Sequence, residues 1–297
     1  MKRWGSRYRD VRTGRTLDTW FPRAGEPIER GCLAQKYGLI QADRVEVEVE
    51  SFENGPKSTE EAYLCLHLLS ELQTPPNSIN LDKVYELLTI VAWTSAGPVL
   101  PDCVNELRSA VAADDHQLVI YSIDKFPRMV DYVIPTDVRI ADPDRVRLGA
   151  HLSPGTTVMH EGFVNFNAGT SGAAMVEGRV TPGVIVGSGS DIGAGSSIMG
   201  TLSGGGKQVN SVGKNSLLGA NSGIGISLGD RCVVEAGLYV TAGTLVQLST
   251  GERVKAREVS GCSDLLFRRN SVTGSVEVLS SEGVSWSGLN TKLHSNT

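Results

Sequence analysis

Long apolar runs are missing from this chain of 297 residues, since no stretch approaches the roughly 20 apolar residues that a membrane-spanning helix needs. The amino terminus, Met-Lys-Arg-Trp-Gly, also lacks the apolar core of an export signal. These two absences predict a soluble protein of the cytoplasm with no membrane partner.

Cysteine, aromatic residues and positive charge are also scarce. The five cysteines are widely spread without a Cys-x-x-Cys pair, which favours reduced thiols over disulfides or a metal cluster. Lys and Arg number 28 against 33 Asp and Glu, and no basic patch with interleaved aromatic residues occurs. We therefore expect no nucleic-acid partner, and any anionic ligand must be held by local cations and backbone N–H groups.

An aliphatic residue recurs at every sixth position through the middle of the chain. The positions are Ile134, Ile140, Val146, Leu152, Val158 and Val164, then Val180, Val186, Ile192 and Ile198, then Val212, Leu218 and Ile224, and after a slip of two residues Leu228, Val234, Val240 and Val246. This spacing matches neither an amphipathic helix nor an alternating strand. It is typical of hexapeptide repeats, which form a parallel β-helix.

The geometry of such a repeat explains the composition. Each six-residue unit would form one short strand and one corner, and three units would close a triangular coil with the aliphatic residue inside. The 34 glycines suit the corners. Coils stacked at about 4.8 Å would bury one another's apolar faces. Hexapeptide proteins coil left-handedly, so we expect a mainly β protein built on a left-handed parallel β-helix.

Three parts are expected: a mixed α/β domain over residues 1–130, the β-helix over 131–250, and a short β cap with a tail over 251–297, disordered past Asn290. Within the first part, Ser58 and Glu61 form a capping box for a helix that ends at Pro75. Other elements expected are strands near Thr16–Phe21, Arg44–Phe52, Leu118–Ile123 and Ser275–Leu279, a helix from Asn80 or Asp82 that includes Val91, and a helix over Asp102–Ala113. The rest of residues 1–43 is expected to be irregular.

Two interruptions break the repeat, and insertions in repeat folds often form loops that carry the site. The first, between Val164 and Val180, contains Glu177 and Arg179. A loop carboxylate could act as nucleophile or general base, and the arginine could orient a substrate carboxylate. An exposed surface ion pair is the alternative, and from these residues alone it is the more frequent outcome.

The second interruption, between Ile198 and Val212, contains Ser-Gly-Gly-Gly-Lys at residues 203–207. It departs from the phosphate-binding P-loop, because Thr201 replaces the first glycine and Gln208 follows the lysine. We interpret it as a Gly-rich loop over a groove, in which Lys207 either attracts an anion or is simply solvated.

Acidic residues and histidines in the repeat raise the question of a metal. Asp144 and Glu161 fall on separate coils, with His160 beside them. Around the threefold axis of a trimer, repeated carboxylates would repel one another without a divalent cation, although solvated acids are the alternative. Only His151 and His160 lie in the repeat, too few for the three-histidine zinc site of γ-type carbonic anhydrases.

Five longer strings are more specific than the repeat. Residues 160–169, 175–179, 198–206 and 234–240, with Lys-Phe-Pro-Arg-Met-Val-Asp-Tyr at 125–132, resemble the 2,3,4,5-tetrahydropyridine-2,6-dicarboxylate N-succinyltransferase family, actinobacterial type, over about residues 117–250. The resemblance implies transfer of succinyl from succinyl-CoA to the amine of ring-opened tetrahydrodipicolinate. The products would be CoA and N-succinyl-2-amino-6-oxopimelate, in lysine biosynthesis by the diaminopimelate route. It also implies a homotrimer with sites between subunits.

The resemblance further implies residue roles. Glu177 matches the catalytic glutamate, acting through an acyl-anhydride or as general base, and Arg179 would contact the succinyl or CoA portion. Asp144 and Glu161 match the ligands of a divalent cation, magnesium or calcium, on the trimer axis. The other substrate and CoA positions are Ala194, Ser197, Ala220, Glu235, Ala236, Gly243, Lys255, Arg268, Arg269, Asn270 and Ser271, of which Lys255, Arg268 and Arg269 would meet the CoA phosphates. Ala194 stands where the family would have glycine, which matters little for a backbone contact.

Two other hypotheses remain open. Another hexapeptide acyltransferase, with an acetyl donor, would show a catalytic histidine within the repeat, for which only His151 and His160 are candidates. A non-catalytic β-helix scaffold would need neither the two interruptions nor the basic cap. The residues of the first domain that contact the acceptor are not fixed by the sequence, and Arg128 is one candidate.

Overall fold

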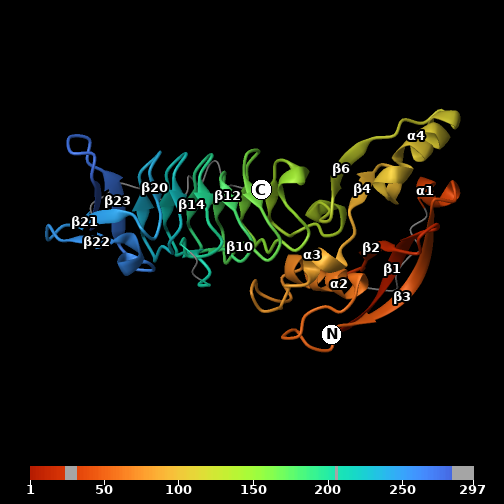
Figure 1. Ribbon diagram of the computed structural model, residues 1–297, viewed down its shortest axis with the longest axis horizontal. Coiled ribbons are helices and arrows are strands. Elements are labelled where there is room, and N and C mark those ends of the chain that lie inside the picture. Colours follow the sequence, from red (N-terminus) through yellow and green to blue (C-terminus); the bar gives the residue numbers. More distant parts are fainter. Residues whose placement is uncertain (24–31, 205–206, 283–297) are drawn as a thin grey trace. The chain divides into compact units, whose positions relative to one another are not determined.

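The computed structural model describes residues 1–23, 32–204 and 207–282, and the chain divides into two compact units, Met1–Val133 and Ile134–Thr297 (Figure 1). The disorder predicted past Asn290 lies outside the described residues. Among those residues, no helix has the length and apolar character needed to cross a membrane.

The first unit contains two antiparallel sheets of three strands. One has the order β2-β1-β3 and the other β5-β4-β6. Their strands are β1 (Lys2–Asp10), β2 (Thr16–Trp20), β3 (Ile40–Glu48), β4 (Val91–Thr94), β5 (Gly97–Val99) and β6 (Ile120–Asp124). The expectation of an irregular start is wrong, because β1 pairs with a strand on each side. Its buried positions include Ser6, Tyr8 and Asp10, so the usual apolar alternation is absent from the sequence.

The helices of this unit are short apart from two. They are α1 (Leu33–Lys36), α2 (Thr59–Ser70), α3 (Val84–Leu87) and α4 (Val104–Ala113). Of the predicted capping box of α2, the Ser58 half is confirmed, since Ser58 Oγ accepts a hydrogen bond from the Glu61 N–H at 3.2 Å. The Glu61 carboxylate accepts from the Lys57 N–H at 3.0 Å, one residue before the predicted donor. The predicted helix that was to include Val91 ends earlier, with α3. Leu88 already has an extended backbone and Val91 begins β4, so this part of the prediction is wrong.

His67 of α2 is fully buried between two aromatic rings, with centroid distances of 5.3 Å to Phe21 and 5.5 Å to Tyr132. Burial, assisted by the charge of Arg3, lowers the pKa of His67 to about 3. An unfolded histidine titrates near 6.5, so between these values the unfolded chain binds more protons and stability falls as the pH drops.

We therefore expect the wild type to lose about 3 kcal/mol more of its free energy of unfolding between pH 7 and pH 4 than the variant His67→Leu loses. Urea unfolding of both proteins at the two pH values measures this difference. If the free energy of unfolding fell equally in the two proteins, His67 would bind the same number of protons in the folded and the unfolded chain, and the prediction would be wrong.

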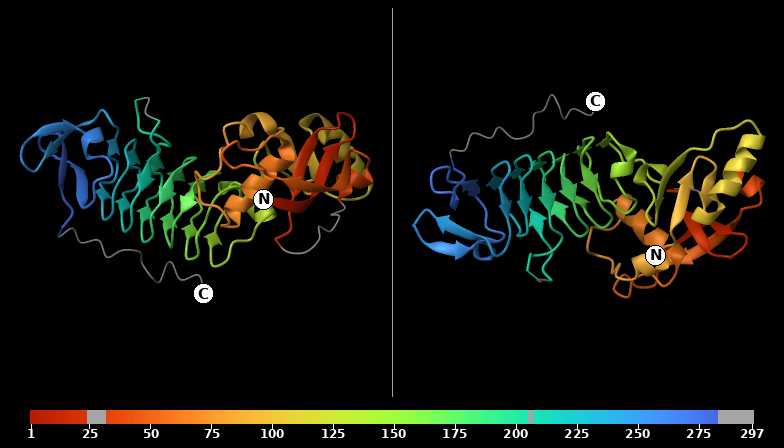
Figure 2. Two further views of the ribbon diagram at one scale, coloured as in Figure 1. Left: turned by 90° about the horizontal axis from the view of Figure 1, so that it is seen from below. Right: turned by 45° about the horizontal axis from the view of Figure 1, so that its top comes forward.

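The second unit is a left-handed parallel β-helix, as predicted, with stacked coils of three short strands (Figures 1 and 2). The first sheet contains β7 (Arg139–Ile140), β8 (Thr157–Val158), β11 (Met175–Val176), β14 (Asp191–Ile192), β17 (Leu217–Leu218) and β19 (Val233–Val234). The second contains β9 (Phe163–Val164), β12 (Arg179–Val180), β15 (Ser197–Ile198), β18 (Gly223–Ile224) and β20 (Tyr239–Val240). The third contains β10 (Gly169–Thr170), β13 (Ile185–Val186) and β16 (Ser211–Val212).

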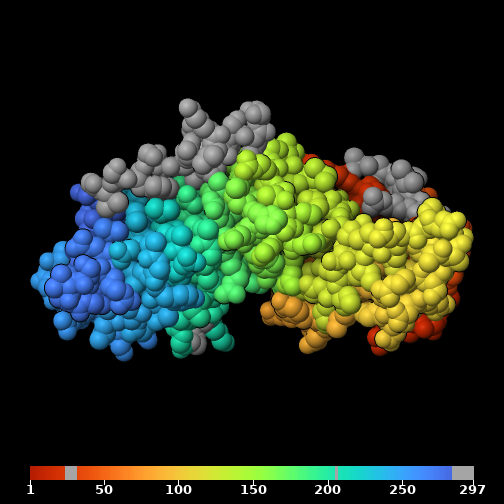
Figure 3. Space-filling model, turned by 90° about the horizontal axis from the view of Figure 1, so that it is seen from above, coloured from red at the N-terminus to blue at the C-terminus, as the bar shows by residue number. Residues whose placement is uncertain are grey.

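The repeat residues form the interior of the prism. From Val158 to Val246 nearly all of these aliphatic side chains are fully buried, because each one packs on its counterpart in the next coil. Neighbouring coils also pack closely at the surface, with no visible gap between them (Figure 3, green to blue). Ile134, which the spacing assigned to the interior, is 72% exposed, so the prism begins after it.

The first interruption is not an ejected loop, and this corrects the sequence interpretation. The six-residue spacing continues from Val164 through Thr170 to Val176, with buried Thr170 in an aliphatic position. The break comes only between Val176 and Val180, where the turn is shortened to two residues. Thr170 hid the continuity because a hydroxyl residue is not counted as part of an apolar pattern.

The second interruption is a true insertion between β15 and β16. Its arms pair at Thr201 and Val209, and the Ser203 N–H donates to the Gly225 carbonyl at 2.9 Å. Lys207 is exposed on this insertion. The predicted β cap is also present, with β21 (Leu245–Leu248), β22 (Arg253–Lys255), β23 (Leu265–Arg269) and β24 (Val276–Ser280). It extends the first sheet, because β23 pairs in parallel with β19.

Candidate active site on one edge of the prism

The turns from the first sheet to the second stack into one edge of the prism, here called the first edge (residues 159–162, 177–178, 193–196, 219–222 and 235–238). Predicted site residues from five coils gather on it: Glu161, Glu177, Ala194, Ala220, Glu235 and Ala236. Arg179 and Ser197 begin the strands that follow these turns. Gly243 lies elsewhere, in the turn after β20, and Lys255 lies in β22 of the cap.

Glu177 occupies the shortest turn of the first edge. Its backbone N–H donates to the Ile192 carbonyl of the next coil at 2.8 Å, and its side chain is half-buried. The next residue, Gly178, presses on that coil, since a Cβ there would lie 2.2 Å from Ser196 Oγ and 2.7 Å from the Ser196 carbonyl oxygen. The short turn therefore fixes the backbone that carries the carboxylate.

Arg179 points along the second sheet. The register pairs it with Ser197, and its Nη2 and Nε donate to Ser197 Oγ at 2.8 and 3.2 Å. The guanidinium is thus held by a neutral hydroxyl rather than by Glu177, which leaves its positive charge at the exposed surface beside the first edge. That arrangement suits an anionic ligand better than the surface ion pair that the sequence left open.

Asp191 of β14 is an acidic residue that the sequence interpretation missed. Burial, and then the negative charge of Glu177, raise the pKa of Asp191 to about 6. The corresponding positions of the neighbouring coils are Thr157, Met175, Leu217 and Val233. A carboxylate between the uncharged residues of the coils on either side was therefore a signal in the sequence, but it required the correct register to be seen.

The far end of the first edge meets the cap. Glu235 Oε2 accepts a hydrogen bond from the Arg269 backbone N–H at 2.6 Å, so the edge continues into β23. Arg268 is ion-paired with Glu277 at 3.0 Å, and Asn270 donates to the same carboxylate at 2.7 Å. Hydrogen bonds from Asn270 and then Arg268 lower the pKa of Glu277. Lys255, Arg269 and Ser271 are exposed.

The predicted cation ligands lie at the opposite end of the prism. The pairing of Val146 with Val164 places Asp144 one coil away from Gly162, beside Glu161, and both acids are exposed. Within the described ranges, no group of three or more His, Cys, Asp or Glu side chains of one chain could hold a metal ion. Two carboxylates are a fitting donor type for magnesium or calcium but an incomplete set, so further ligands would have to come from symmetry-related chains or water.

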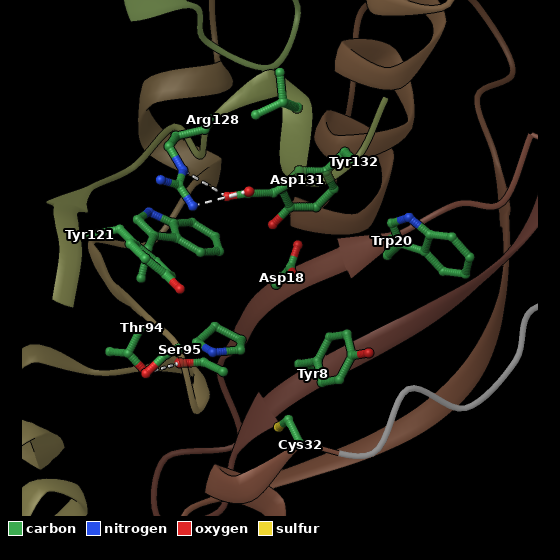
Figure 4. A pocket seen from close by; sticks show the side chains of 14 residues that line it. Tyr8, Asp18, Trp20, Cys32, Thr94, Ser95, Tyr121, Arg128, Asp131 and Tyr132 are labelled. Carbon is green, nitrogen blue, oxygen red and sulfur yellow. Dashed lines mark hydrogen bonds and ion pairs between the residues drawn. The ribbon is translucent and has the colours of Figure 1, made fainter. Parts of the chain in front are cut away.

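A separate cavity of about 460 Å³ lies inside the first unit (Figure 4). Arg128 donates to both carboxylate oxygens of Asp131, at 2.9 and 3.1 Å, and lies 4.1 Å from the centre of the Tyr121 ring. Asp18 and Tyr132 also line the cavity, and Tyr132 donates a hydrogen bond to Asp18. Arg128 is thus already bound to a carboxylate of its own unit, and its contact with the acceptor stays a prediction.

Comparison with known proteins identifies the family. The 2,3,4,5-tetrahydropyridine-2,6-dicarboxylate N-succinyltransferase of Vibrio cholerae is 56% identical over 247 residues, which cover 81% of this chain and 71% of the relative. The chain belongs to the tetrahydrodipicolinate N-succinyltransferase family. The enzyme of the same name from Pseudomonas aeruginosa is 58% identical over 227 residues, covering 75% of this chain and 66%, just under two thirds, of the relative.

Family models and a solved structure agree with membership in the tetrahydrodipicolinate N-succinyltransferase family. Residues 88–128 match the model described as its middle region, and residues 209–242 match the hexapeptide repeat of succinyl-transferase. A Campylobacter jejuni crystal structure, provisionally described as a 2,3,4,5-tetrahydropyridine-2-carboxylate N-succinyltransferase, has a TM-score of 0.81 at 30% identity. It covers 95% of this chain and 92% of its own.

Proposed function

We propose that this chain is a tetrahydrodipicolinate N-succinyltransferase, which moves succinyl from succinyl-CoA to the amine of tetrahydrodipicolinate in lysine and diaminopimelate biosynthesis. The observation that carries the proposal is the 56% identity to the V. cholerae enzyme of that name. We place the reaction in the cytoplasm. Support from the site itself is the position of Glu177, the matched glutamate, on the first edge beside the cationic Arg179.

Glu177 has two possible roles in this transfer, and both use its anionic form. As a nucleophile, its carboxylate oxygen would attack the thioester carbonyl and expel the CoA thiolate, giving an acyl-anhydride that the amine then opens. As a general base, it would remove the proton that the attacking amine loses. Arg179 would hold the succinyl carboxylate or the CoA arm through charge-assisted hydrogen bonds.

The remaining matched residues would bind the CoA arm along the prism. Small residues of the first edge, Ala194, Ala220 and Ala236, let a ligand approach the backbone, and Ser197 and Glu235 flank them. Arg269, Lys255 and Ser271 are exposed at the cap and suit the CoA phosphates. Arg268 and Asn270 already bind Glu277, so their contribution would be to shape the turn rather than to supply free charge. Gly243 would line the neighbouring turn.

We also propose a homotrimer with a divalent cation on its axis. Asp144 and Glu161 supply two exposed carboxylates from each chain, and three copies would bring six oxygen-donor side chains together. Such a cluster would repel itself unless magnesium or calcium neutralised it. A cation on the axis would therefore hold the three chains together at the end of the prism that carries Asp144 and Glu161.

The function is tested by CoA thiol release from succinyl-CoA and freshly prepared tetrahydrodipicolinate. We expect release that depends on both substrates, with little release when acetyl-CoA replaces succinyl-CoA. Equal use of acetyl-CoA would favour the alternative hexapeptide acyltransferase. Absence of release with either donor would leave the binding-scaffold hypothesis, and the mass of the assembly in the same sample would show whether the protein tested was a trimer.

A further inference from the structure

We infer that Asp191 is a positioning residue for the reaction at Glu177: its ionised carboxylate favours every step in which Glu177 gives up its negative charge. The inference rests on the proposed function and adds a second acidic residue to that site. It follows from where the fold places the two side chains and from which charges surround them.

The two residues are brought together by the register of successive coils. Strands β11 and β14 pair in parallel, with Met175 opposite Asp191 and Val176 opposite Ile192, and the Glu177 N–H donates to the Ile192 carbonyl at 2.8 Å. Ile192 is fully buried inside the prism, so Asp191, the residue before it in the strand, faces outward on the side where Glu177 begins the turn. The backbones that carry the two side chains are therefore held at a fixed spacing by the stack.

One cation lies near this pair, Arg179 at the start of β12, and its guanidinium donates to Ser197 Oγ rather than to either carboxylate. The turn stacked on the other side of Glu177, residues 159–162, carries His160 and Glu161. Strand β17, on the other side of β14, contributes Leu217 and Leu218, and the stretch of the first edge that follows β17 carries no ionisable side chain. Lys214 precedes β17 in a turn whose backbone packs on Gly187 rather than on Asp191. Burial comes first and Glu177 second among the causes of the raised pKa of Asp191, so Glu177 is the charged group that acts on it within the described residues.

Repulsion between the two carboxylates is relieved when one of them loses its charge. If Glu177 acts as nucleophile, its oxygen bonds to the succinyl carbon, the C–S bond breaks, and the electron pair leaves on the CoA sulfur. The amine nitrogen then bonds to the same carbon, the C–O bond to Glu177 breaks, and the amine proton passes to the thiolate. If Glu177 acts as base, it takes the amine proton while the amine nitrogen bonds to the succinyl carbon; the C–S bond then breaks, and Glu177 passes the proton to the CoA thiolate. Both routes neutralise Glu177 at the first step, and both are favoured by an anion beside it.

The test is the pH dependence of kcat/KM for CoA release, from pH 5 to 8.5, in the wild type and in Asp191→Asn. We expect the wild-type value to fall as the pH drops through about 6, where Asp191 takes up a proton. Asp191→Asn should be lower by about tenfold at pH 7.5, should lack this step, and should meet the wild-type profile near pH 5. Asp191→Glu, which keeps a carboxylate at this position, should again show a fall in kcat/KM as the pH drops.

Controls separate this inference from a structural effect and from the proposed function. Glu252→Gln, which removes an exposed carboxylate in the turn between β21 and β22, should leave the profile unchanged. A uniform loss at every pH in Asp191→Asn, or an unchanged step near pH 6, would overturn the inference while the succinyltransferase function stood. If the wild type released no CoA thiol at any pH, the proposed function and the inference would both be wrong.

A second measurement does not depend on activity. In carboxyl ¹³C spectra of protein labelled at aspartate, Glu177→Gln should shift the titration of Asp191 downward from about 6, because one of the two causes of its raised pKa is removed. If the pKa of Asp191 were the same in Glu177→Gln and in the wild type, the two carboxylates would not interact, and the inference would be wrong.

Discussion

Glu177→Gln should lower kcat/KM for succinyl transfer roughly a thousandfold, because an amide can neither attack the thioester nor accept the amine proton. The substitution preserves size, and the structural hydrogen bond at this residue is made by its backbone N–H to the Ile192 carbonyl. The loss should therefore be one of chemistry and not of folding. CoA thiol release under saturating succinyl-CoA measures it, with thermal unfolding and assembly mass as checks.

The matched control for this substitution is Glu252→Gln, which removes the same charge from an exposed turn and should change the rate little. If Glu177→Gln retained activity within tenfold of the wild type, Glu177 would be reduced to a positioning role and the site would need another base. A variant that unfolds or fails to assemble would instead assign to Glu177 a structural role that its half-buried position does not suggest.

Gly178→Ala should destabilise the β-helix by about 2–3 kcal/mol, the second large effect, because the added methyl group would overlap the next coil. A Cβ would lie 2.7 Å from the Ser196 carbonyl oxygen and 2.9 Å from that of Gly193, both of which are backbone atoms that cannot move without disturbing the stack. Urea unfolding measures the change. Activity should fall with it, since the turn that holds Glu177 would shift.

Gly243→Ala provides the comparison, because a Cβ at Gly243 has no atom within 4 Å. We expect its unfolding free energy to lie within about 0.5 kcal/mol of the wild type, as for an ordinary surface change. Equal stabilities of the two variants would mean that the short turn at Gly178 relaxes freely, and that it does not fix the position of Glu177.

The interior of the prism could be predicted because one residue type at one spacing is sufficient to specify it. Val180, Val186 and Ile192 each fill the same place in successive turns of the chain, so the spacing of six determines the coil. The first unit was predicted less well, since β1 carries Ser6, Tyr8 and Asp10 on its buried side. Their burial depends on partners distant in the sequence, which a local pattern does not reveal.

Membership in the family was also predictable, because long strings of residues around Glu177 and Arg179 are specific. The environment of those residues was not. The sequence suggested a loop ejected from the prism, whereas the structure has a two-residue turn pressed against the next coil. The difference arises from Thr170, which is buried in the repeat although it is polar.

By itself, the sequence determined the coil, the order of the parts and the family, since these follow from spacing along the chain and from motifs that are contiguous. The tertiary structure alone decided which residues share the first edge, that Arg268 is already paired with Glu277, and that the strand carrying Asp191 is hydrogen-bonded to the backbone of Glu177. These depend on the register between coils. A turn shortened by two residues or an insertion changes how many residues separate neighbours in space, and only the hydrogen-bonded stack fixes that number.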